Sequence, residues 1–279
     1  MKDQQSLWMK LEKTVGLQKL IALIALIVIF GFFAISSESF RSFDTAVSIL
    51  DASYYIGFLA IGVTFVIITS GIDLSIGTVM MCSAIIGGVL HTKLGWPLWL
   101  SLLAILVIGG VFGLFNGILI AKFGLPPFIA TLGTMMISRG LSSIVSNVQS
   151  VTFPLRGTGE GWYKDLFRTK ENFPTGLIVL IVIAIIAAIV LNKTKIGRYI
   201  FAIGSNKEAT RLSGVNVIKW EAMAYVISGL FAGLAGIAYA ATYSTILPGT
   251  GNGMELDAIA GVVVGGTSLA GGVGSVLGT

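Results

Sequence analysis

A polar segment interrupts a long apolar stretch in the first third of this sequence. Residues 69–77 read Thr-Ser-Gly-Ile-Asp-Leu-Ser-Ile-Gly and carry one carboxylate, Asp73, followed two positions later by the hydroxyl of Ser75. A carboxylate within apolar sequence is costly unless it faces water, protein or a cation. Asp73 can cap the helix that follows it by accepting the first amide hydrogens of that helix, and we favour this interpretation. In the alternative, Asp73 and Ser75 form a polar element beside a path for a polar solute.

A second polar break lies near the end of the sequence, at 265–274. It places Thr267 and Ser268 between glycines, and it repeats the order glycine, serine-leucine, glycine of the first break. Two broken helices in corresponding parts of a membrane protein indicate a repeated architecture with a binding path between the repeats. Thr267 and Ser268 are therefore further candidates for such a path.

Two more polar side chains, Asn116 and Thr131, lie in apolar sequence on either side of the pair Pro126-Pro127. The prolines end one helix and open the next, where missing amide hydrogens cost little. Asn116 and Thr131 can line the path or form hydrogen bonds between helices. We favour the second role.

Residue types that support catalysis are scarce. The chain has one cysteine, Cys82, and one histidine, His91, which together cannot supply a zinc site. The sequence lacks the pattern Gly-x-x-x-x-Gly-Lys-Ser/Thr that binds ATP phosphates. It also shows no serine–histidine pairing and no paired carboxylates at a useful spacing. We therefore expect no enzyme activity and no cofactor in this chain.

The composition is that of a membrane protein. Of the 279 residues, 55% are hydrophobic and 11% are charged, whereas about 25% of the residues of a soluble domain are charged. So few charges could not cover a water-facing surface, and we predict an all-α, polytopic bundle of transmembrane helices in a lipid bilayer. The net charge of +5 comes largely from cations near the ends of apolar runs, so it does not indicate nucleic-acid binding.

A transmembrane helix needs about 20 apolar residues, and on this basis we predict about eight spans. The first run lacks a small-residue cleavage site, so we interpret it as a retained span and not as a signal peptide. The eighth is the apolar region from 256 to the end. The other seven lie near 20–36, 47–70, 74–91, 97–121, 126–147, 175–192 and 221–243.

Glycines recur four residues apart in two of these spans, at Gly109, Gly113 and Gly117 and again at Gly229 and Gly233. Small residues at this spacing allow two helices to approach closely. We predict packing seams here and not a role in transport.

The distribution of cations orients the chain in the membrane. Four lysines precede the first span, at positions 2, 10, 13 and 19, and they place the N-terminus in the cytoplasm. Six spans later, the segment 193–219 carries six cations and one anion, so we predict that it is cytoplasmic too. The loop 148–174 has nearly balanced charges, and we predict that it is external.

The basic segment contains the signals of a short helix, which we expect over 205–213. Ser205 and Glu208 fit a capping box, in which each side chain bonds a backbone amide across the first turn. Gly214 can adopt the left-handed conformation that ends a helix. Glu208 and Arg211 are three residues apart and can form an ion pair on the exposed face.

Ala209 and Leu212 lie on another strip of the same short helix. One interpretation of the helix is an ordinary linker between two spans. The functional interpretation is a docking element for a cytoplasmic partner, to which Ala209 and Leu212 would offer a small apolar contact.

Several motifs in the same order resemble one known family, the permease subunits of ribose- and galactose-type ATP-binding-cassette importers. They are Gly71-Ile72-Asp73-Leu74-Ser75-Ile76-Gly77, the stretch 116–135, the stretch 197–215, Glu255-Leu256-Asp257-Ala258-Ile259-Ala260 and the glycine-rich break 265–274. Ser205 and Thr210 depart from the more usual small residues. Members have about ten spans, so the resemblance implies one permease domain over 1–279 that is incomplete at its C-terminus.

The resemblance implies specific roles and partners. In the family, the loop that corresponds to 193–219 contacts an ATPase subunit, which would bind ATP and Mg²⁺ in place of this chain. Two permease copies would form the pathway, and an extracytoplasmic solute-binding protein would deliver the solute. The coupling residues implied are Gly204, Ser205, Asn206, Glu208, Ala209, Arg211, Leu212 and Gly214.

The expected function is import of a monosaccharide, ribose or a related sugar, across the bacterial cytoplasmic (inner) membrane. A neutral sugar needs hydroxyl, amide and aromatic partners and no intramembrane charge, which fits the few charges within the spans. The alternatives are a permease for another small solute, such as a nucleoside or a branched-chain amino acid, and an ion-coupled secondary transporter. The last would use Asp51 and Asp73, the acidic residues well within the first six spans.

Overall fold

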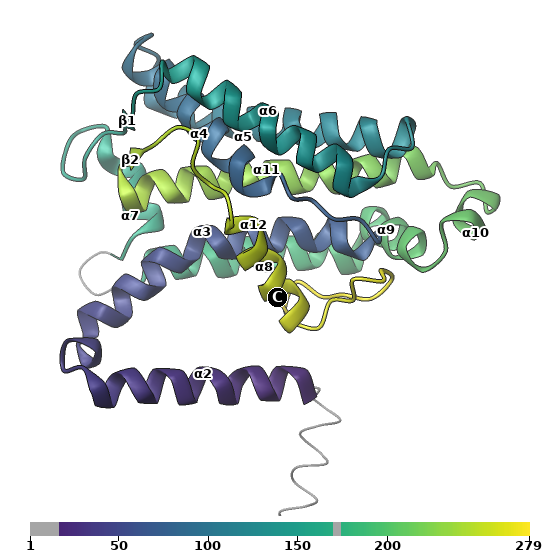
Figure 1. The fold of residues 1–279 in the computed structure, drawn as a ribbon, viewed down its shortest axis with the longest axis horizontal. Coiled ribbons are helices and arrows are strands. Elements are labelled where there is room, and N and C mark those ends of the chain that lie inside the picture. Colours follow the sequence, from purple (N-terminus) through teal and green to yellow (C-terminus); the bar gives the residue numbers. More distant parts are fainter. Residues whose placement is uncertain (1–16, 170–173) are drawn as a thin grey trace, which may run out of the picture.

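The computed structural model describes residues 17–169 and 174–279, and almost all of its regular structure is helical (Figure 1). The long helices are α2 (Leu17–Ser36), α3 (Phe43–Ile68), α4 (Ile76–Thr92), α5 (Leu98–Gly117), α6 (Pro127–Ser146), α8 (Thr175–Lys193), α9 (Lys195–Ser205), α11 (Val217–Tyr243) and α12 (Met254–Val264). The short elements are η1 (Ser39–Arg41), the π-helical turn η2 (Ile118–Lys122), β1 (Val151–Thr152), η3 (Gly161–Tyr163), α7 (Lys164–Phe167), α10 (Lys207–Leu212) and β2 (Thr245–Ile246).

The prediction of an all-α membrane bundle is confirmed. Among the described residues, five helices are long and apolar enough to cross a bilayer, and two shorter apolar helices accompany them. The five are Phe43–Ile68, Leu98–Lys122, Pro127–Ser146, Thr175–Lys193 and Val217–Tyr243, and the two are Leu23–Ser36 and Ile76–Thr92. Each of these helices overlaps one of the seven spans predicted from hydropathy.

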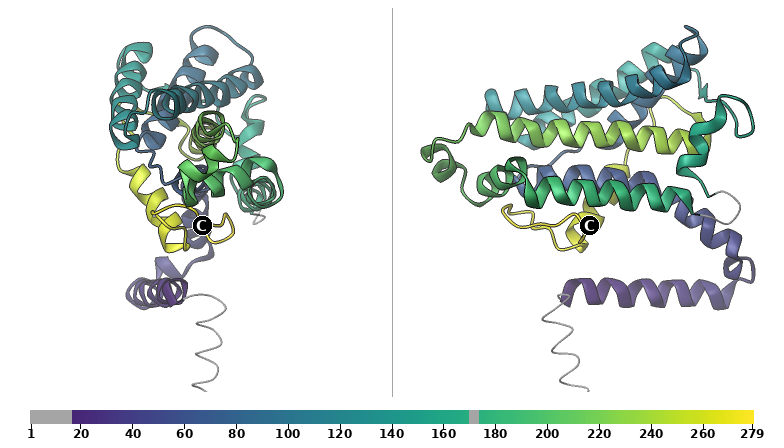
Figure 2. Two further views of the ribbon diagram at one scale, coloured as in Figure 1. Left: turned by 90° about the vertical axis from the view of Figure 1, so that its right-hand side faces the viewer. Right: turned by 180° about the vertical axis from the view of Figure 1, so that it is seen from behind.

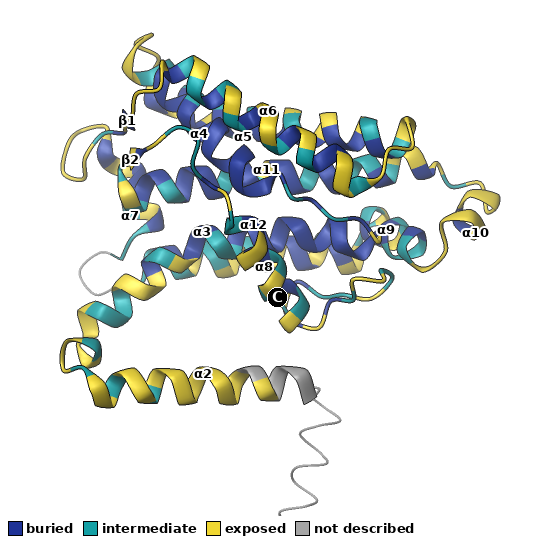
Figure 3. Ribbon diagram, in the orientation of Figure 1, coloured by how far each residue is buried: buried dark blue, intermediate teal, exposed yellow. Residues whose placement is uncertain are grey.

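The helix α11 lies in the middle of the bundle, between α5 and α3 (Figures 1 and 2). Buried residues concentrate on these central helices, whereas α2 lies apart from them and exposes large apolar side chains (Figure 3). The outer faces of α5, α6 and α8 are also apolar. Apolar side chains on a protein's outer surface are the expected arrangement where lipid tails are the solvent.

The contact between α5 and α11 is a glycine seam, as predicted. A methyl group on Gly109 would lie 2.2 Å from the Gly229 carbonyl oxygen, and one on Gly113 would lie 2.2 Å from the Tyr225 carbonyl oxygen. The same contact restricts Gly229, because a methyl group added there would lie 2.2 Å from the Gly109 carbonyl oxygen. The two backbones are therefore in direct contact, which only small residues permit.

Two extended segments enter the bundle from opposite ends (Figure 1). After α3, residues 69–75 lead from the end near α9 to α4, which begins at Ile76 in the middle of the bundle. After β2, residues 247–253 lead from the opposite end to α12. The segments meet where a methyl group on Gly77 would lie 2.3 Å from the Gly251 carbonyl oxygen. The first helix break is thus confirmed.

The prediction of an eighth span from 256 onward is wrong for the described structure. Helix α12 has 11 residues, which gives a length of about 16 Å at 1.5 Å per residue, and a bilayer core is about 30 Å thick. Non-helical segments therefore flank α12 on both sides, at 247–253 and at 265–274. Residues 247–253 read Leu-Pro-Gly-Thr-Gly-Asn-Gly and lie between the predicted spans.

Candidate transport and coupling sites

Asp73 lies in a buried polar cluster at the start of α4. Its Oδ1 atom accepts hydrogen bonds from the Ser75 amide at 3.0 Å and the Ser75 hydroxyl at 2.6 Å, and its Oδ2 atom accepts one from Ser228 of α11 at 2.9 Å. The favoured capping interpretation is wrong in detail. Ser75 is itself the residue at the N-cap, so Asp73 holds this residue in a local turn and does not bind the first amides of the helix.

Asn116 extends this cluster to two more helices. Its Nδ2 atom donates to the Ser75 hydroxyl at 2.9 Å, and its Oδ1 atom accepts from Thr134 of α6 at 2.5 Å. The favoured prediction that Asn116 bonds across helices is confirmed. Thr134 was not singled out from the sequence, although it lies three residues after Thr131 on the same helix face, and four residues before Ser138.

The cluster is closed within this chain. The cavity lined by Asp73, Ser75 and Asn116 is too small for a water molecule. Thr131 stays outside it, and the favoured prediction that Thr131 bonds across helices is wrong, because its hydroxyl donates to the Pro127 carbonyl of its own helix at 2.8 Å. The three clustered residues therefore hold α4, α5, α6 and α11 together, and Thr131 serves its own helix.

Thr267 and Ser268 lie away from this cluster, in the segment after α12 that packs against the end of α3. The Gly272 amide donates to the Ile68 carbonyl at 2.9 Å, and the Ser70 hydroxyl donates to Ala270 at 2.8 Å. The Thr267 hydroxyl is buried and has no hydrogen-bond partner among the described residues. The two breaks therefore touch through Ser70 and Ala270, but Thr267 and Ser268 do not join the polar cluster at Asp73.

We predict that Asn116→Leu destabilises the folded protein. It removes both cross-helix bonds and leaves the buried hydroxyls of Ser75 and Thr134 with one partner fewer, which costs about 1–3 kcal/mol for each unsatisfied group. Thermal unfolding of the detergent-purified chain measures the effect. Asn192→Leu is the matched control, because Asn192 is exposed at the end of α8. Equal melting temperatures for the two variants would contradict the prediction.

The basic segment 193–219 contains two helices where the sequence predicted one. Thr194 is the N-cap of helix α9, since its hydroxyl accepts the Ile196 amide at 3.2 Å, and the helix buries Ile200 and Ile203. The 3–4 residue spacing of Ile196, Ile200 and Ile203 is the signal that could have revealed it. At its end, Gly204 fits closely, since a methyl group there would lie 1.7 Å from the Ile68 carbonyl oxygen.

The predicted N-cap at Ser205 is wrong by one residue, because the N-cap of α10 is Asn206. Because α9 continues through Ser205, the first residue with an extended backbone is Asn206, and its side chain accepts the Ala209 amide at 2.9 Å. Glu208 pairs with Arg211, with 3.0 Å between the carboxylate and the guanidinium, as predicted. Gly214 has φ of +81°, which confirms the predicted left-handed residue after the helix.

The surface of α9 and α10 contains a hollow of about 430 Å³. Ala209 is exposed and lines this hollow. Leu212 is not part of the lining, and 80% of its surface is exposed. The two residues predicted to share one contact strip therefore offer two neighbouring features, a hollow and a projecting apolar side chain. The hollow is lined by Arg198, Tyr199, Ala202, Ser205, Asn206, Ala209, Thr210, Ser213 and Val215.

An ion pair that the sequence reasoning missed connects α10 to the central helix α11. The Lys207 ammonium is 2.8 Å and 2.7 Å from the two carboxylate oxygens of Glu221, which is buried. Removing one partner of such a pair leaves an uncompensated buried charge. Two turns further along α11, Ser228 bonds to Asp73. Helix α11 thus contacts both the α10 surface and the buried polar cluster.

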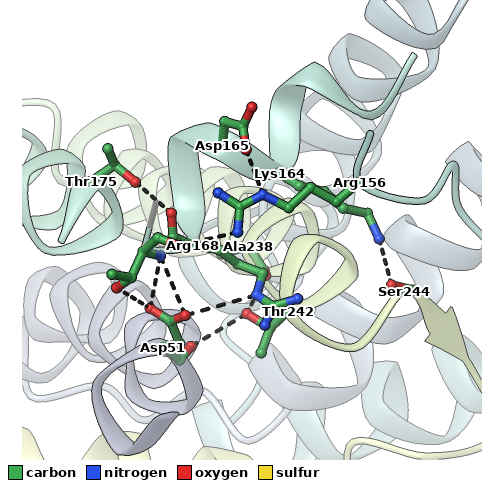
Figure 4. Close-up of polar contacts among 10 residues, drawn as sticks. Asp51, Arg156, Lys164, Asp165, Arg168, Thr175, Ala238, Thr242 and Ser244 are labelled. Carbon is green, nitrogen blue, oxygen red and sulfur yellow. Dashed lines mark hydrogen bonds and ion pairs between the residues drawn. The ribbon is translucent and has the colours of Figure 1, made fainter. Parts of the chain in front are cut away.

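At the opposite end of the bundle, polar contacts hold the loop that contains α7 (Figure 4). Asp51 of α3 accepts bonds from the Thr169 amide at 3.2 Å and hydroxyl at 2.9 Å, and its carboxylate is 3.8 Å from Arg168. Lys164 donates to the Ser244 hydroxyl at the end of α11. Burial lowers the pKa of the Lys164 ammonium, and the charge of Arg168 lowers it further. The loop is therefore anchored to both α3 and α11.

Comparison with known proteins places the chain in a family. Residues 45–279 match the family described as "Branched-chain amino acid transport system / permease component". The ribose import permease protein of Escherichia coli (strain K12) is 37% identical over 262 residues, which are 92% of this chain and 80% of that protein. No solved structure matches the chain.

Two other relatives are similar to most of the chain. The fructose import permease protein of Bifidobacterium longum (strain NCC 2705) is 39% identical over 238 residues, covering 82% of this chain and 69% of that protein. The xylose transport system permease protein of Haemophilus influenzae is 31% identical over 325 residues, covering 95% and 86%. The match to the family model and the extent of these similarities show that the chain belongs to this family of transport-system permease components.

Proposed function

We propose that this chain is the permease subunit of an ATP-driven importer and that it translocates a monosaccharide, ribose or a related sugar. The observation that carries the proposal is that the relatives named above import ribose, fructose and xylose while sharing 31–39% of their aligned residues with this chain.

The surface formed by α9 and α10 is the proposed site for the ATPase subunit, which supplies ATP, Mg²⁺ and their chemistry. Within the coupling loop 193–219, Asn206 and Gly214 define the limits of α10, and Glu208 with Arg211 braces its exposed face. Ala209 and Leu212 offer the apolar contact. Gly204 and Ser205 connect this surface to the end of α3, where Gly204 contacts Ile68.

The remaining assembly follows from the same proposal. A second permease copy completes the pathway in a homodimer, since the polar cluster of one chain is closed. A solute-binding protein delivers the sugar at the end that carries the α7 loop. The host membrane is the bacterial cytoplasmic membrane, with the N-terminus in the cytoplasm. Residues 1–279 are proposed to belong to one transmembrane domain.

Two alternatives differ in what they require of the chain. A nucleoside or branched-chain amino acid permease would keep the ATPase and change the solute, and the family description names the second class. An ion-coupled transporter would need Asp51 or Asp73 to bind its ion. Asp73 already accepts three hydrogen bonds, and Asp51 binds Thr169, so an importer driven by ATP is the simpler proposal.

Reconstitution of the complete importer tests this function. Proteoliposomes that contain the permease and its ATPase should hydrolyse ATP faster when a sugar-loaded binding protein is added, and they should accumulate labelled ribose, fructose or xylose. The purified chain alone should hydrolyse no ATP. Uptake driven by an ion gradient without ATP, or hydrolysis by the chain alone, would contradict the proposal.

The proposed orientation predicts which loops react with a membrane-impermeant thiol reagent. In a background without Cys82, the Thr158→Cys variant should be labelled in intact cells, and the Ser205→Cys variant only after the membrane is opened. Thr158 and Ser205 are both exposed and lie in elements at opposite ends of the bundle. A difference in labelling therefore reports the side of the membrane and not the burial of the residue. Labelling of the Ser205→Cys variant in intact cells would reverse the topology.

A further inference from the structure

Three tyrosines form one aromatic cluster between α3 and α11, in the half of the bundle nearer β2. The ring centroids of Tyr55 and Tyr239 are 5.1 Å apart, those of Tyr239 and Tyr243 are 4.5 Å apart, and those of Tyr55 and Tyr243 are 6.2 Å apart. The Asp257 carboxylate of α12 is close enough to act electrostatically on the Tyr55 hydroxyl. Three elements thus bring aromatic rings and a carboxylate to one place.

The cluster is buried on one side and open on the other. Tyr55 is 8% exposed, Tyr239 is partly exposed, and Tyr243 is 45% exposed. Asp257 is exposed although α12 begins deep in the bundle, one turn after Gly251 contacts Gly77 of α4. A carboxylate at membrane depth is stable only where it faces water or a partner. The exposed Asp257 carboxylate therefore requires water or a polar partner on its open side.

The groups in this cluster suit a neutral sugar. Aromatic rings provide flat, apolar faces with large contact area, which can pack against the C–H groups of a sugar ring. A carboxylate provides two oxygens that accept hydrogen bonds, and sugar hydroxyls donate them. Tyrosine hydroxyls both donate and accept. The buried cluster at Asp73 has no room for a ligand, whereas the tyrosine cluster is open.

We propose that Tyr55, Tyr239, Tyr243 and Asp257 form a sugar-contacting site in the half of the translocation pathway nearer the α7 loop. The inference rests on the proposed function and assigns the residues that first meet the solute after its release from the binding protein. The rings hold the sugar by its apolar face, and Asp257 binds its hydroxyls.

Uptake by the reconstituted importer tests this site, with labelled ribose, fructose and xylose as the probes. Asp257→Asn and Tyr55→Phe should lower uptake about ten-fold, equivalent to about 1.4 kcal/mol, while ATP hydrolysis stimulated by the binding protein stays near that of the wild type. They should also change the relative uptake of the three sugars. A purely structural role would lower uptake of all three and ATP hydrolysis together.

Two matched controls accompany these variants. Tyr54→Phe removes a hydroxyl from the neighbouring residue of α3, which is buried on another face against Gly176 of α8. Asp44→Asn removes an exposed carboxylate at the start of the same helix. Both controls should transport like the wild type. If Asp257→Asn and Tyr55→Phe do so as well, the assignment is wrong.

Water access gives a readout that does not depend on transport. In a background without Cys82, a membrane-impermeant thiol reagent should label the Asp257→Cys variant in intact cells, and bound sugar-loaded binding protein should slow the labelling. Labelling only by a membrane-permeant reagent would place Asp257 in lipid or at a protein contact and would overturn the inference. A wild-type complex that transports no sugar would refute the proposed function instead.

Discussion

Gly229→Leu is expected to prevent the central helices from packing and to abolish the folded permease. The first added carbon would lie 2.2 Å from the Gly109 carbonyl oxygen and 2.8 Å from the Gly113 amide nitrogen, and both are backbone atoms. No rotamer change can relieve this contact, so α5 and α11 must move apart over their length. Overpacking in a core costs about 1–3 kcal/mol, and displacement of a whole helix exceeds that range.

The measurement is the yield and melting temperature of the detergent-purified chain, followed by gel filtration. Gly140→Leu is the matched control, because Gly140 is a helical glycine of α6 with no atom within 4 Å of its added carbon. It should purify with a normal melting temperature. A Gly229→Leu protein that behaves in the same way would show that the seam does not determine the packing of α5 against α11.

The helices that cross the membrane were predictable because the hydrocarbon core of a bilayer requires mostly apolar residues along the whole of each span. The predicted span 97–121 corresponds to α5 with η2, and 221–243 lies within α11, which begins four residues earlier at Val217. The first turn of α11 carries Lys219 and Trp220, so the span predicted from hydropathy begins four residues too late. Helix α9 was missed for the same reason, because its exposed face is basic and only its buried face is apolar.

The candidate sites were predictable only where a local signal existed. Asp73 and Asn116 stood out as polar residues in apolar sequence, and both lie in the buried cluster. Their partners did not stand out, because Ser228 is 155 residues from Asp73 and Thr134 is an ordinary helical threonine. The ion pair of Lys207 with Glu221 likewise depends on how the chain turns between α10 and α11.

The tyrosine cluster could not be predicted from the sequence either. Tyr55 lies on α3 and Tyr239 and Tyr243 lie on α11, and single aromatic residues in apolar helices carry no distinguishing pattern. Only the packing of α3 against α11, set by side chains all along both helices, brings the rings together. The placement of Asp257 depends in turn on the path of the segment 247–253 before α12, and hydropathy does not reveal that path.

Leu212→Glu is expected to detach the ATPase subunit while leaving the permease folded and inserted. The Leu212 side chain is 80% exposed at the end of α10, so its replacement disturbs little within the chain. A large apolar side chain that projects from a basic surface is stable when a partner covers it. Burial of an unpaired carboxylate in that contact costs several kcal/mol, which corresponds to loss of ATPase binding by a factor of about 100 or more.

Co-purification of the ATPase subunit with tagged permease, followed by ATP hydrolysis and sugar uptake, measures the effect. Leu155→Glu is the control, since Leu155 is 57% exposed in the loop at the opposite end of the bundle. It should leave ATPase binding intact. Ala209→Glu places a charge in the neighbouring hollow and should weaken the same contact, because Ala209 lines that hollow. If Leu212→Glu and Ala209→Glu both retain full ATPase binding and transport, the docking surface lies elsewhere.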